Sequence, residues 1–575
     1  MKKINLKIMA VIMITAVALS GCGLKKMVRN YDEMVKYSPK VNPLEAHGGE
    51  IAIDVSGRVS EKYFHKSAKI ELTPVLKYNG MEKELAVIHL RGEKVEGEGQ
   101  LINQGAPTNF PLSEVVAFEA GMENMELVIR GSLYKASKPD KRTELPERKA
   151  VAFGTITTPS LLEKDEDLAL VPHGYELETV ITKKANIYFA YMKHNLDWKL
   201  GLNQSADAKK MIEELNTFLK QGWKLKSVDV NAWASPEGEV AYNEKLSSDR
   251  TKTAEKYIAD ILKKEYKNEK IEVKMAAKGE DFDGFMALLN ASDIKDKQAI
   301  ANVINSQLSP AERERKIKDM TIIFAEIEKM LAPLRKAEIV IAAFEPKKTK
   351  EQIAELSTTD PAKLDVKELL YAATLTEDIN TKLAIYKSAT ELYANNYRCF
   401  NNLAWAYLKK GDVKNAALAL EKANQLEPEN GQVLNNLGVV AAWNGDYDNA
   451  KSYYEAAQGK GVRANYNIGH LMIKKGDYAA AVSSYAGRTC TFNVALAHML
   501  NQNLTAATTN IECAPKTAKT HYLAAIIGAR RDLTNMLYDN LKKAIELDPK
   551  FKEKAAKDLE FFKFFNQAEF QDIVK

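Results

Sequence analysis

The chain has 575 residues, enough for about three or four domains of ordinary size. Its 45% hydrophobic and 28% charged residues are typical of soluble globular proteins and exclude a disordered chain or a multi-span membrane protein. A formal net charge of +5 gives no electrostatic argument for nucleic-acid binding, and four cysteines exclude a disulfide-rich scaffold.

The N-terminus has the pattern of a targeting segment. Lys2 and Lys3 precede an apolar run over 8–19, which is too short for a stable membrane-spanning helix but typical of a signal peptide. The following Leu19-Ser20-Gly21-Cys22 resembles the lipobox of bacterial lipoproteins. The resemblance implies that residues 1–21 are removed and that Cys22 carries acyl groups such as palmitate. The residue after the cysteine is Gly23 rather than an aspartate, which favours the outer membrane over retention in the inner membrane. We expect the protein to face the periplasm. The alternative is an ordinary secretory signal with a coincidental cysteine.

Residues 22–48 are polar and predict a tether, whereas 49–181 alternate between apolar and polar residues. Runs such as 51–55, 68–72 and 125–130 predict half-buried strands, and Gly, Pro and Asn clusters separate them. We therefore expect an N-terminal all-β sandwich over 49–181 without a catalytic constellation.

Residues 182–345 alternate between strand and helix patterns. Strands are predicted at 185–191, 223–233, 271–277 and 338–344, with helices at 207–220 and 243–264. A mostly helical insert over about 281–334 precedes the last strand. This order predicts a central α+β domain.

One segment of this domain resembles the OmpA C-terminal family. Gly238, Tyr242, Asn243, Leu246, Ser247 and Arg250 match the family pattern G-x-x-x-Y-N-x-x-L-S-x-x-R. The resemblance implies peptidoglycan binding, with Arg250 holding the diaminopimelate of the stem peptide and Asn243 on the same helix face. The family's loop Asp is replaced by Ser235, and Glu237 is the nearby carboxylate that could substitute for it. The alternative is that the fold serves as a protein-docking platform.

After a linker at 346–362, residues 363–575 predict an all-α array of tetratricopeptide (TPR) repeats with a C-terminal capping helix. Units beginning at Tyr397 and Gly431 carry the small and large signature residues at the spacing of that 34-residue motif. Recurrent turns at Gly411-Asp412, Gly445-Asp446 and Gly476-Asp477 predict a helix end followed by a helix cap.

Four units share an asparagine at position 6, which faces the concave groove in TPR arrays. These are Asn402, Asn436, Asn467 and Asn493. An asparagine offers two donors and an acceptor, so the set predicts a groove that binds an extended protein segment. The alternative is that asparagine simply suits a polar concave surface. Trp405 and Trp443 also face the groove and would be either aromatic anchors or packing residues between repeats.

Cys490 begins the first helix of the fourth repeat hairpin, and Cys513 follows the second. The two ends of an antiparallel hairpin lie side by side, so we predict a Cys490–Cys513 disulfide and a buried free thiol at Cys399.

The sequence contains none of the common hydrolase, metalloprotease or nucleotide-binding motifs. We therefore expect neither catalysis, nor a metal, nor a cofactor. The interpretation is a lipid-anchored scaffold that links the outer membrane to peptidoglycan, to a periplasmic protein complex, or to both. The alternative is a surface-exposed accessory of a nutrient-uptake or secretion machine, and a hydrolase is a more distant alternative.

Overall fold

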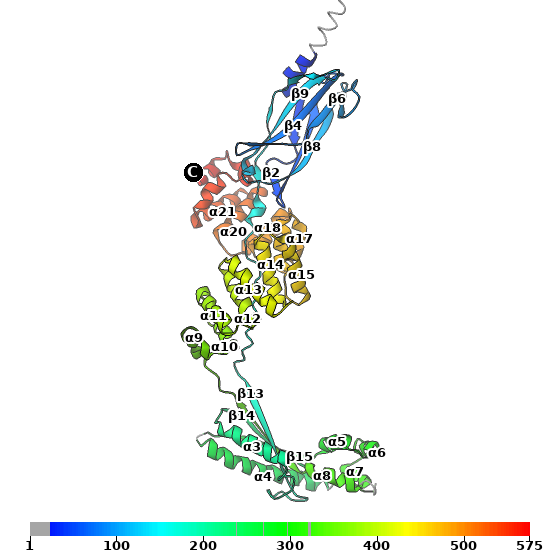
Figure 1. Ribbon diagram of the computed structural model, residues 1–575, viewed down its shortest axis with the longest axis vertical. Helices are drawn as coiled ribbons and strands as arrows, with labels where there is room; N and C mark the ends of the chain where they lie inside the picture. The colour runs from blue at the N-terminus through cyan, green and yellow to red at the C-terminus, as the bar shows by residue number, and fades with distance from the viewer. Residues whose placement is uncertain (1–22, 237–238, 268, 296, 307, 320–323) are drawn as a thin grey trace, which may run out of the picture. The chain divides into compact units, whose positions relative to one another are not determined.

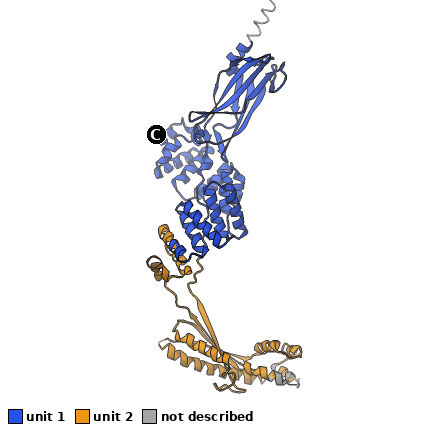
Figure 2. Cartoon of the chain, viewed as in Figure 1, with its two compact units in different colours: residues 1–172, 386–575 blue, residues 173–385 orange. Residues whose placement is uncertain are grey.

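The computed structural model describes residues 23–575 except 237–238, 268, 296, 307 and 320–323. The chain forms two compact units, which are coloured separately in Figure 2. Unit 1 combines residues up to Pro172 with residues from Tyr386 to Lys575, and unit 2 contains His173–Ile385.

The N-terminal part of unit 1 is a sandwich of two sheets, as the alternating pattern predicts (Figure 1). In β3 (Glu50–Val59) every second residue is buried, which places its apolar side chains between the sheets. The first sheet contains β3 together with β1 (Val35–Pro39), β2 (Leu44–His47), β8 (Thr108–Ala117) and β12 (Thr155–Ile156). The second contains β4 (Ala68–Tyr78), β5 (Met81–Glu84), β6 (Ile88–Gly92), β7 (Gln100–Ile102), β9 (Glu126–Lys135), β10 (Lys138–Glu144) and β11 (Arg148–Phe153).

Residues 23–48 are not the tether that their polarity suggests. A helical segment over 23–29 and α2 (Tyr31–Met34) lead into β1 and β2, which pair with β3. Met27, Tyr31 and Val35 are buried in the sandwich core. A few large apolar side chains are sufficient to fix this segment, although its average composition is polar.

The sandwich therefore starts earlier than residue 49, and it also ends earlier than residue 181. The last strand of the sandwich is β12, and a short 3-10 helix over Thr158–Leu161 follows it. Residues 162–172, which we call the strap, form neither a helix nor a strand.

The C-terminal part of unit 1 is a succession of antiparallel helix pairs that rises in Figure 1 from the yellow-green α12 and α13 to the orange-red α20 and α21. The pairs are α12 (Tyr397–Lys409) with α13 (Val413–Leu426), α14 (Gly431–Trp443) with α15 (Tyr447–Gly459), α16 (Asn465–Lys474) with α17 (Tyr478–Ser484), α18 (Phe492–Leu500) with α19 (Leu504–Cys513), and α20 (Ala518–Arg530) with α21 (Thr534–Leu547). The predicted turns are confirmed at Gly411, whose φ is 74°, and at Asp412, whose side chain accepts from the Asn415 amide.

The chain ends in three short elements rather than one capping helix. These are α22 (Lys550–Ala555), a 3-10 helix over Leu559–Phe564, and α23 (Ala568–Val574). Phe561 and Phe570 are buried in the core of the array, whereas Phe562 packs against Phe153 of the sandwich with ring centroids 4.7 Å apart.

Unit 2 contains a four-stranded sheet of order β13-β16-β14-β15. The strands are β13 (Val180–Tyr188), β14 (Leu225–Ala234), β15 (Val273–Glu280) and β16 (Lys336–Phe344), and only β14 and β15 are parallel. Buried side chains of α3 (Ala206–Lys220) and α4 (Val240–Glu265) share one core with this sheet. The α+β prediction is therefore confirmed at the level of its strands and helices, within a few residues at each end.

The insert between β15 and β16 is helical, as predicted. It contains α5 (Phe282–Ala291), α6 (Lys297–Ile304), α7 (Pro310–Asp319) and α8 (Phe324–Leu331), and it has a small apolar core of its own. Residues 346–362, expected to be a linker, instead contain α9 (Lys350–Thr359), which begins with a Thr349–Gln352 capping box. The helices α10 (Val366–Ala372) and α11 (Ile379–Leu392) follow.

Across the described part of the chain, no helix has both the length and the apolar character that crossing a membrane requires.

Candidate functional site

The concave groove of the helical array holds the strap of the same chain. Asn402 accepts from the backbone N–H of Val171 at 2.9 Å and donates to the Val171 carbonyl at 3.0 Å. Asn436 makes the same pair of bonds with Ala169, at 2.8 and 2.7 Å. Each amide side chain thus satisfies both backbone groups of one strap residue, as a neighbouring β-strand would.

The other two predicted asparagines bind the strap in the same way. Asn467 accepts from the Asp167 N–H at 2.7 Å and donates to its carbonyl at 3.0 Å. Asn493 holds the N–H and carbonyl of Glu163, both at 2.9 Å. The structure therefore brings all four asparagines onto one extended segment, and that segment belongs to this chain.

A second set of asparagines in the groove was not predicted. Asn401 donates to the Ala169 carbonyl at 3.0 Å, and Asn435 donates to the Asp167 carbonyl at 2.8 Å. They also bond to Asn436 and Asn467, so the side chains form a continuous ladder beneath the strap. The sequence pattern that could have revealed them is the Asn-Asn pair, which occurs at 401–402 and again at 435–436, one repeat later.

Hydrogen bonds from the groove hold the side chain of Asp165 in the strap. His470, itself only 2% exposed, lies 2.8 Å from a carboxylate oxygen of Asp165, and Tyr466 donates to the other oxygen at 2.8 Å. Burial raises the pKa of Asp165, but hydrogen bonds from His470, Tyr466 and Asn493 outweigh it and hold that pKa below its ordinary value.

Two further ion pairs follow the same pattern. Arg488 pairs with Asp167, and Lys519 pairs with Glu163 at 3.1 Å. The groove therefore holds the strap backbone with asparagines and the strap carboxylates with His470, Tyr466, Arg488 and Lys519.

The two groove tryptophans differ in their surroundings. The ammonium of strap residue Lys164 lies 5.3 Å from the ring centroid of Trp443, which places Trp443 at the strap. Lys409 of the same helix lies 5.6 Å from the ring of Trp405.

Cys490 and Cys513 form a disulfide, with their Cα atoms 4.9 Å apart. This is the pairing that the hairpin geometry predicts. Cys399 is a buried free thiol, and burial raises its pKa to about 12.

The central domain contains a cavity of about 260 Å³ at the N-terminal end of α4. Three of the predicted wall-binding residues, Ser235, Asn243 and Arg250, line this cavity. Tyr191, Met192, Glu239, Tyr242 and Leu246 complete the lining. Glu237, the fourth residue predicted to bind peptidoglycan, lies outside the described residues, and so does Cys22, the predicted lipidation site.

Arg250 is fully buried, and its donors first satisfy the backbone. Nε donates to the Lys193 carbonyl at 3.0 Å, and the Nη atoms donate to the carbonyls of Trp233 and Ala190 at 2.9 and 3.4 Å. The Arg250 guanidinium therefore ties the loop after β13 and the end of β14 to α4 at the base of the cavity.

Ser235 and Asn243 also take part in the cavity's framework. Asn243 donates to the Ser235 carbonyl at 3.3 Å and to the Glu280 carboxylate at 2.8 Å. Arg335 donates to the Ser235 hydroxyl at 3.3 Å. The Arg335 guanidinium thus lies beside Ser235, and the exposed Glu239 at the start of α4 provides an acidic group in the lining.

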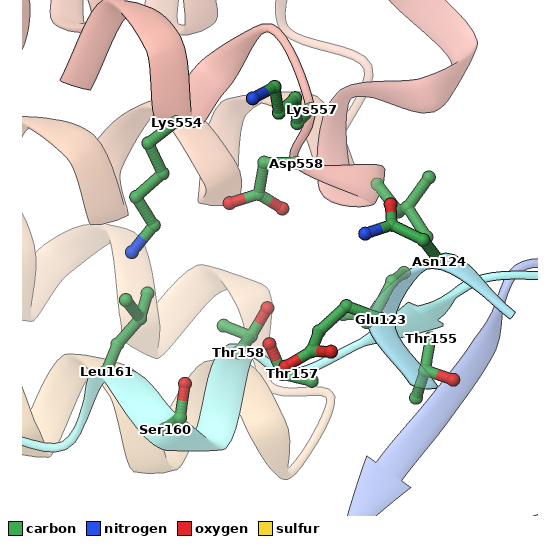
Figure 3. A pocket seen from close by; sticks show the side chains of 12 residues that line it. Glu123, Asn124, Thr155, Thr157, Thr158, Ser160, Leu161, Lys554, Lys557 and Asp558 are labelled. Carbon is green, nitrogen blue, oxygen red and sulfur yellow. The ribbon is translucent and has the colours of Figure 1, made fainter. Parts of the chain in front are cut away.

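A second cavity, of about 220 Å³, lies within unit 1 where the sandwich meets the C-terminal helices (Figure 3). Glu123, Lys554 and Asp558 lie around it. The Thr158 hydroxyl donates a hydrogen bond to the Glu560 carboxylate. Burial raises the pKa of Glu560 above its ordinary value, although Glu560 also forms an ion pair with Arg530. These contacts fasten the end of the array to the sandwich.

Within the described ranges, no group of three or more His, Cys, Asp or Glu side chains is arranged to hold a metal ion.

The comparisons identify the helical array. A family model for the tetratricopeptide repeat matches residues 397–430, 431–459 and 462–486. No curated protein matches the chain in sequence. A tetratricopeptide repeat protein from Parabacteroides merdae is similar in structure, with 17% identity over 39% of this chain and 89% of that chain and a TM-score of 0.29.

Two further solved structures are similar over part of the chain. Pseudomonas aeruginosa PilF shows 15% identity over 37% of this chain and 96% of that chain, with a TM-score of 0.27. YrrB, described as a TPR protein with an unusual peptide-binding site, shows 22% identity over 35% and 94%, with a TM-score of 0.20. The helix pairs over 397–486 are therefore tetratricopeptide repeats, a fold typical of protein–protein interaction scaffolds.

Proposed function

We propose that this protein is a non-enzymatic, lipid-anchored scaffold of the cell envelope, which links the outer membrane to peptidoglycan, to a periplasmic protein complex, or to both. The repeats supply the protein-interaction part, and the lipobox-like Leu19-Ser20-Gly21-Cys22 supports the membrane part. Several acyl chains on Cys22 would anchor the chain stably, because each buried methylene contributes about 0.8 kcal/mol.

The observation that carries the wall-binding part is the cavity of the central domain. Ser235, Asn243 and Arg250 were named from the sequence alone, and they line the same cavity. Its exposed mouth residues, Tyr191 at 54% and Tyr242 at 41%, offer apolar surface beside the acidic Glu239. An acidic group next to a buried cation suits a ligand that carries both an amine and a carboxylate, such as diaminopimelate.

Co-sedimentation of the full chain with purified peptidoglycan at low salt tests this part. We expect weak binding by the wild type, tighter binding by Ser235→Asp, and a loss of about tenfold in Tyr242→Ala. Lys256→Ala, an exposed lysine of α4 outside the lining, is the matched control and should bind as the wild type does.

Arg250 is best tested with a conservative change. Arg250→Ala would leave the carbonyls that it satisfies without their charged donor, at a cost of roughly 3 kcal/mol or more, so loss of binding could reflect unfolding. Arg250→Lys keeps the charge and removes the planar fork, and we expect it to fold and to bind less. If neither the wild type nor Ser235→Asp sediments with the wall material, the domain is a protein-docking platform instead.

The orientation of the protein is tested separately. Protease treatment of intact cells should leave a periplasm-facing protein uncut, whereas digestion would support the surface-exposed accessory. Labelling with a fatty-acid analogue should mark the wild type and not Cys22→Ser.

A further inference from the structure

We propose that the asparagine groove also binds an acidic extended peptide from another molecule, in exchange for the strap. In this view the strap is a built-in occupant that keeps the groove closed until a competing segment replaces it. The proposal concerns the repeats alone and stands apart from the wall-binding cavity.

The contacts that hold the strap are mostly independent of its sequence. Asn402, Asn436 and Asn467 each bond both backbone groups of one residue, and Asn401 and Asn435 add further bonds to strap carbonyls. Because every peptide has the same backbone groups, any extended segment in the same register can make these bonds. The groove is therefore built for extended peptides in general.

The charges of the groove select acidic segments among them. His470 contacts Asp165, Arg488 pairs with Asp167, and Lys519 pairs with Glu163. These three carboxylates occupy alternate positions along the strap, so they lie on one side of an extended chain. A competing segment needs acidic residues at the same two-residue spacing to make the same ion pairs.

Release of the strap leaves the core of the sandwich intact. Lys164, Asp165 and Leu170 remain exposed in the bound strap, whereas Glu166 and Val171 are buried. The sandwich core consists of residues up to Ala152, whereas Leu162 of the strap packs against the apolar core of the array. Release of the strap therefore exposes the polar groove rather than the apolar core of the sandwich.

The covalent connection sets the strength that a competitor needs. Because the strap is part of the same chain, its local concentration at the groove is in the millimolar range. A free peptide of the same sequence at a lower concentration therefore cannot displace it. Weakening the strap's own contacts should consequently reveal binding of a free peptide that the wild type conceals.

The experiment measures binding of a fluorescent peptide with the sequence of residues 161–172 to the full chain by anisotropy. The test protein carries Asp165→Asn and Asp167→Asn, which keep the size of the strap side chains and remove two of its charged contacts. We expect this strap variant to bind the peptide at least tenfold more tightly than the wild type. The same peptide with asparagine at both aspartate positions should bind at least tenfold less tightly to the strap variant.

Groove substitutions supply the specificity control. Adding Asn436→Ala and Asn467→Ala to the strap variant should abolish peptide binding, whereas adding Asn449→Ala, an exposed asparagine of α15, should leave it unchanged. Glu163→Gln, which removes only the Lys519 ion pair, provides a milder strap variant that should bind the peptide a few-fold more tightly than the wild type. The proposal is overturned if folded strap variants bind the peptide no more tightly than the wild type, or if the groove substitutions leave binding intact.

Discussion

Asn467 holds both backbone groups of Asp167, at 2.7 and 3.0 Å, although the two residues are 300 positions apart in the chain. This pair shows why the N-terminal sandwich and the repeats belong to one compact unit. The chain leaves the sandwich through the strap, and the repeats close over that strap much later in the sequence.

Replacing Asn402, Asn436 and Asn467 together with alanine should release the strap. Each asparagine contributes two hydrogen bonds to the strap backbone, so we expect roughly 1–3 kcal/mol of lost docking energy per residue. Hydrogen exchange should then become much faster at the amides of Asp167, Ala169 and Val171. Unchanged protection of these amides, relative to an Asn449→Ala control, would contradict the strap geometry.

Acid should also loosen the strap. The pKa of Asp165 is held below its ordinary 3.8, so the ionised form is favoured in the folded protein. Its contribution to strap docking is fully present above the ordinary pKa and is lost as the pH falls through the lower, folded pKa. Hydrogen exchange of the strap amides between pH 6 and pH 2 should show this loosening, and Asp165→Asn should reduce the pH dependence. An identical acid response in that variant would exclude Asp165 as the titrating group.

The Cys490–Cys513 disulfide should stabilise the fourth hairpin. It closes a loop with a sequence separation of 23, and loops of this size are typically stabilised by about 2–4 kcal/mol. The double variant Cys490→Ser with Cys513→Ser should unfold at a correspondingly lower denaturant concentration under non-reducing conditions. Equal stability of the variant and the wild type would show that the bond contributes nothing measurable.

The thiol of Cys399 should be inert in the folded protein. Burial raises its pKa to about 12, so at pH 8 only about one molecule in ten thousand carries the reactive thiolate. Iodoacetamide should label Cys399 slowly in native protein and rapidly in denaturant, as measured by mass spectrometry. Rapid labelling of the native chain would contradict its burial.

The sequence predicted local structure well because periodicity and turn residues are local signals. The asparagines at position 6 were recognisable because the repeat register places them in the groove. The strap could not be recognised as the segment that fills the groove, because nothing in Glu163–Val171 marks it as the partner of residues more than 200 positions away. Long-range pairing of this kind depends on the assembled groove rather than on local propensity.

The polar N-terminal stretch shows the same limit. Met27 and Tyr31 bury their side chains against strands that follow them in the chain. The prediction missed these two residues because it relied on the average polarity of the segment. In the central domain, Asn243 and Arg250 on α4 and Ser235 in the segment before it line one cavity. The carbonyls that Arg250 binds come from segments before α4, including the loop at Lys193, and no spacing rule connects that loop to the helix.

A bridging assay tests the proposed scaffold most directly. Purified lipidated protein in phospholipid vesicles would be mixed with peptidoglycan sacculi at low salt, and vesicle lipid that sediments with the sacculi would be measured. The account predicts that wild-type protein carries vesicles into the pellet, that Ser235→Asp carries more, and that Cys22→Ser and Tyr242→Ala carry far less. Vesicles that stay in the supernatant with both the wild type and Ser235→Asp would contradict the link between membrane and wall.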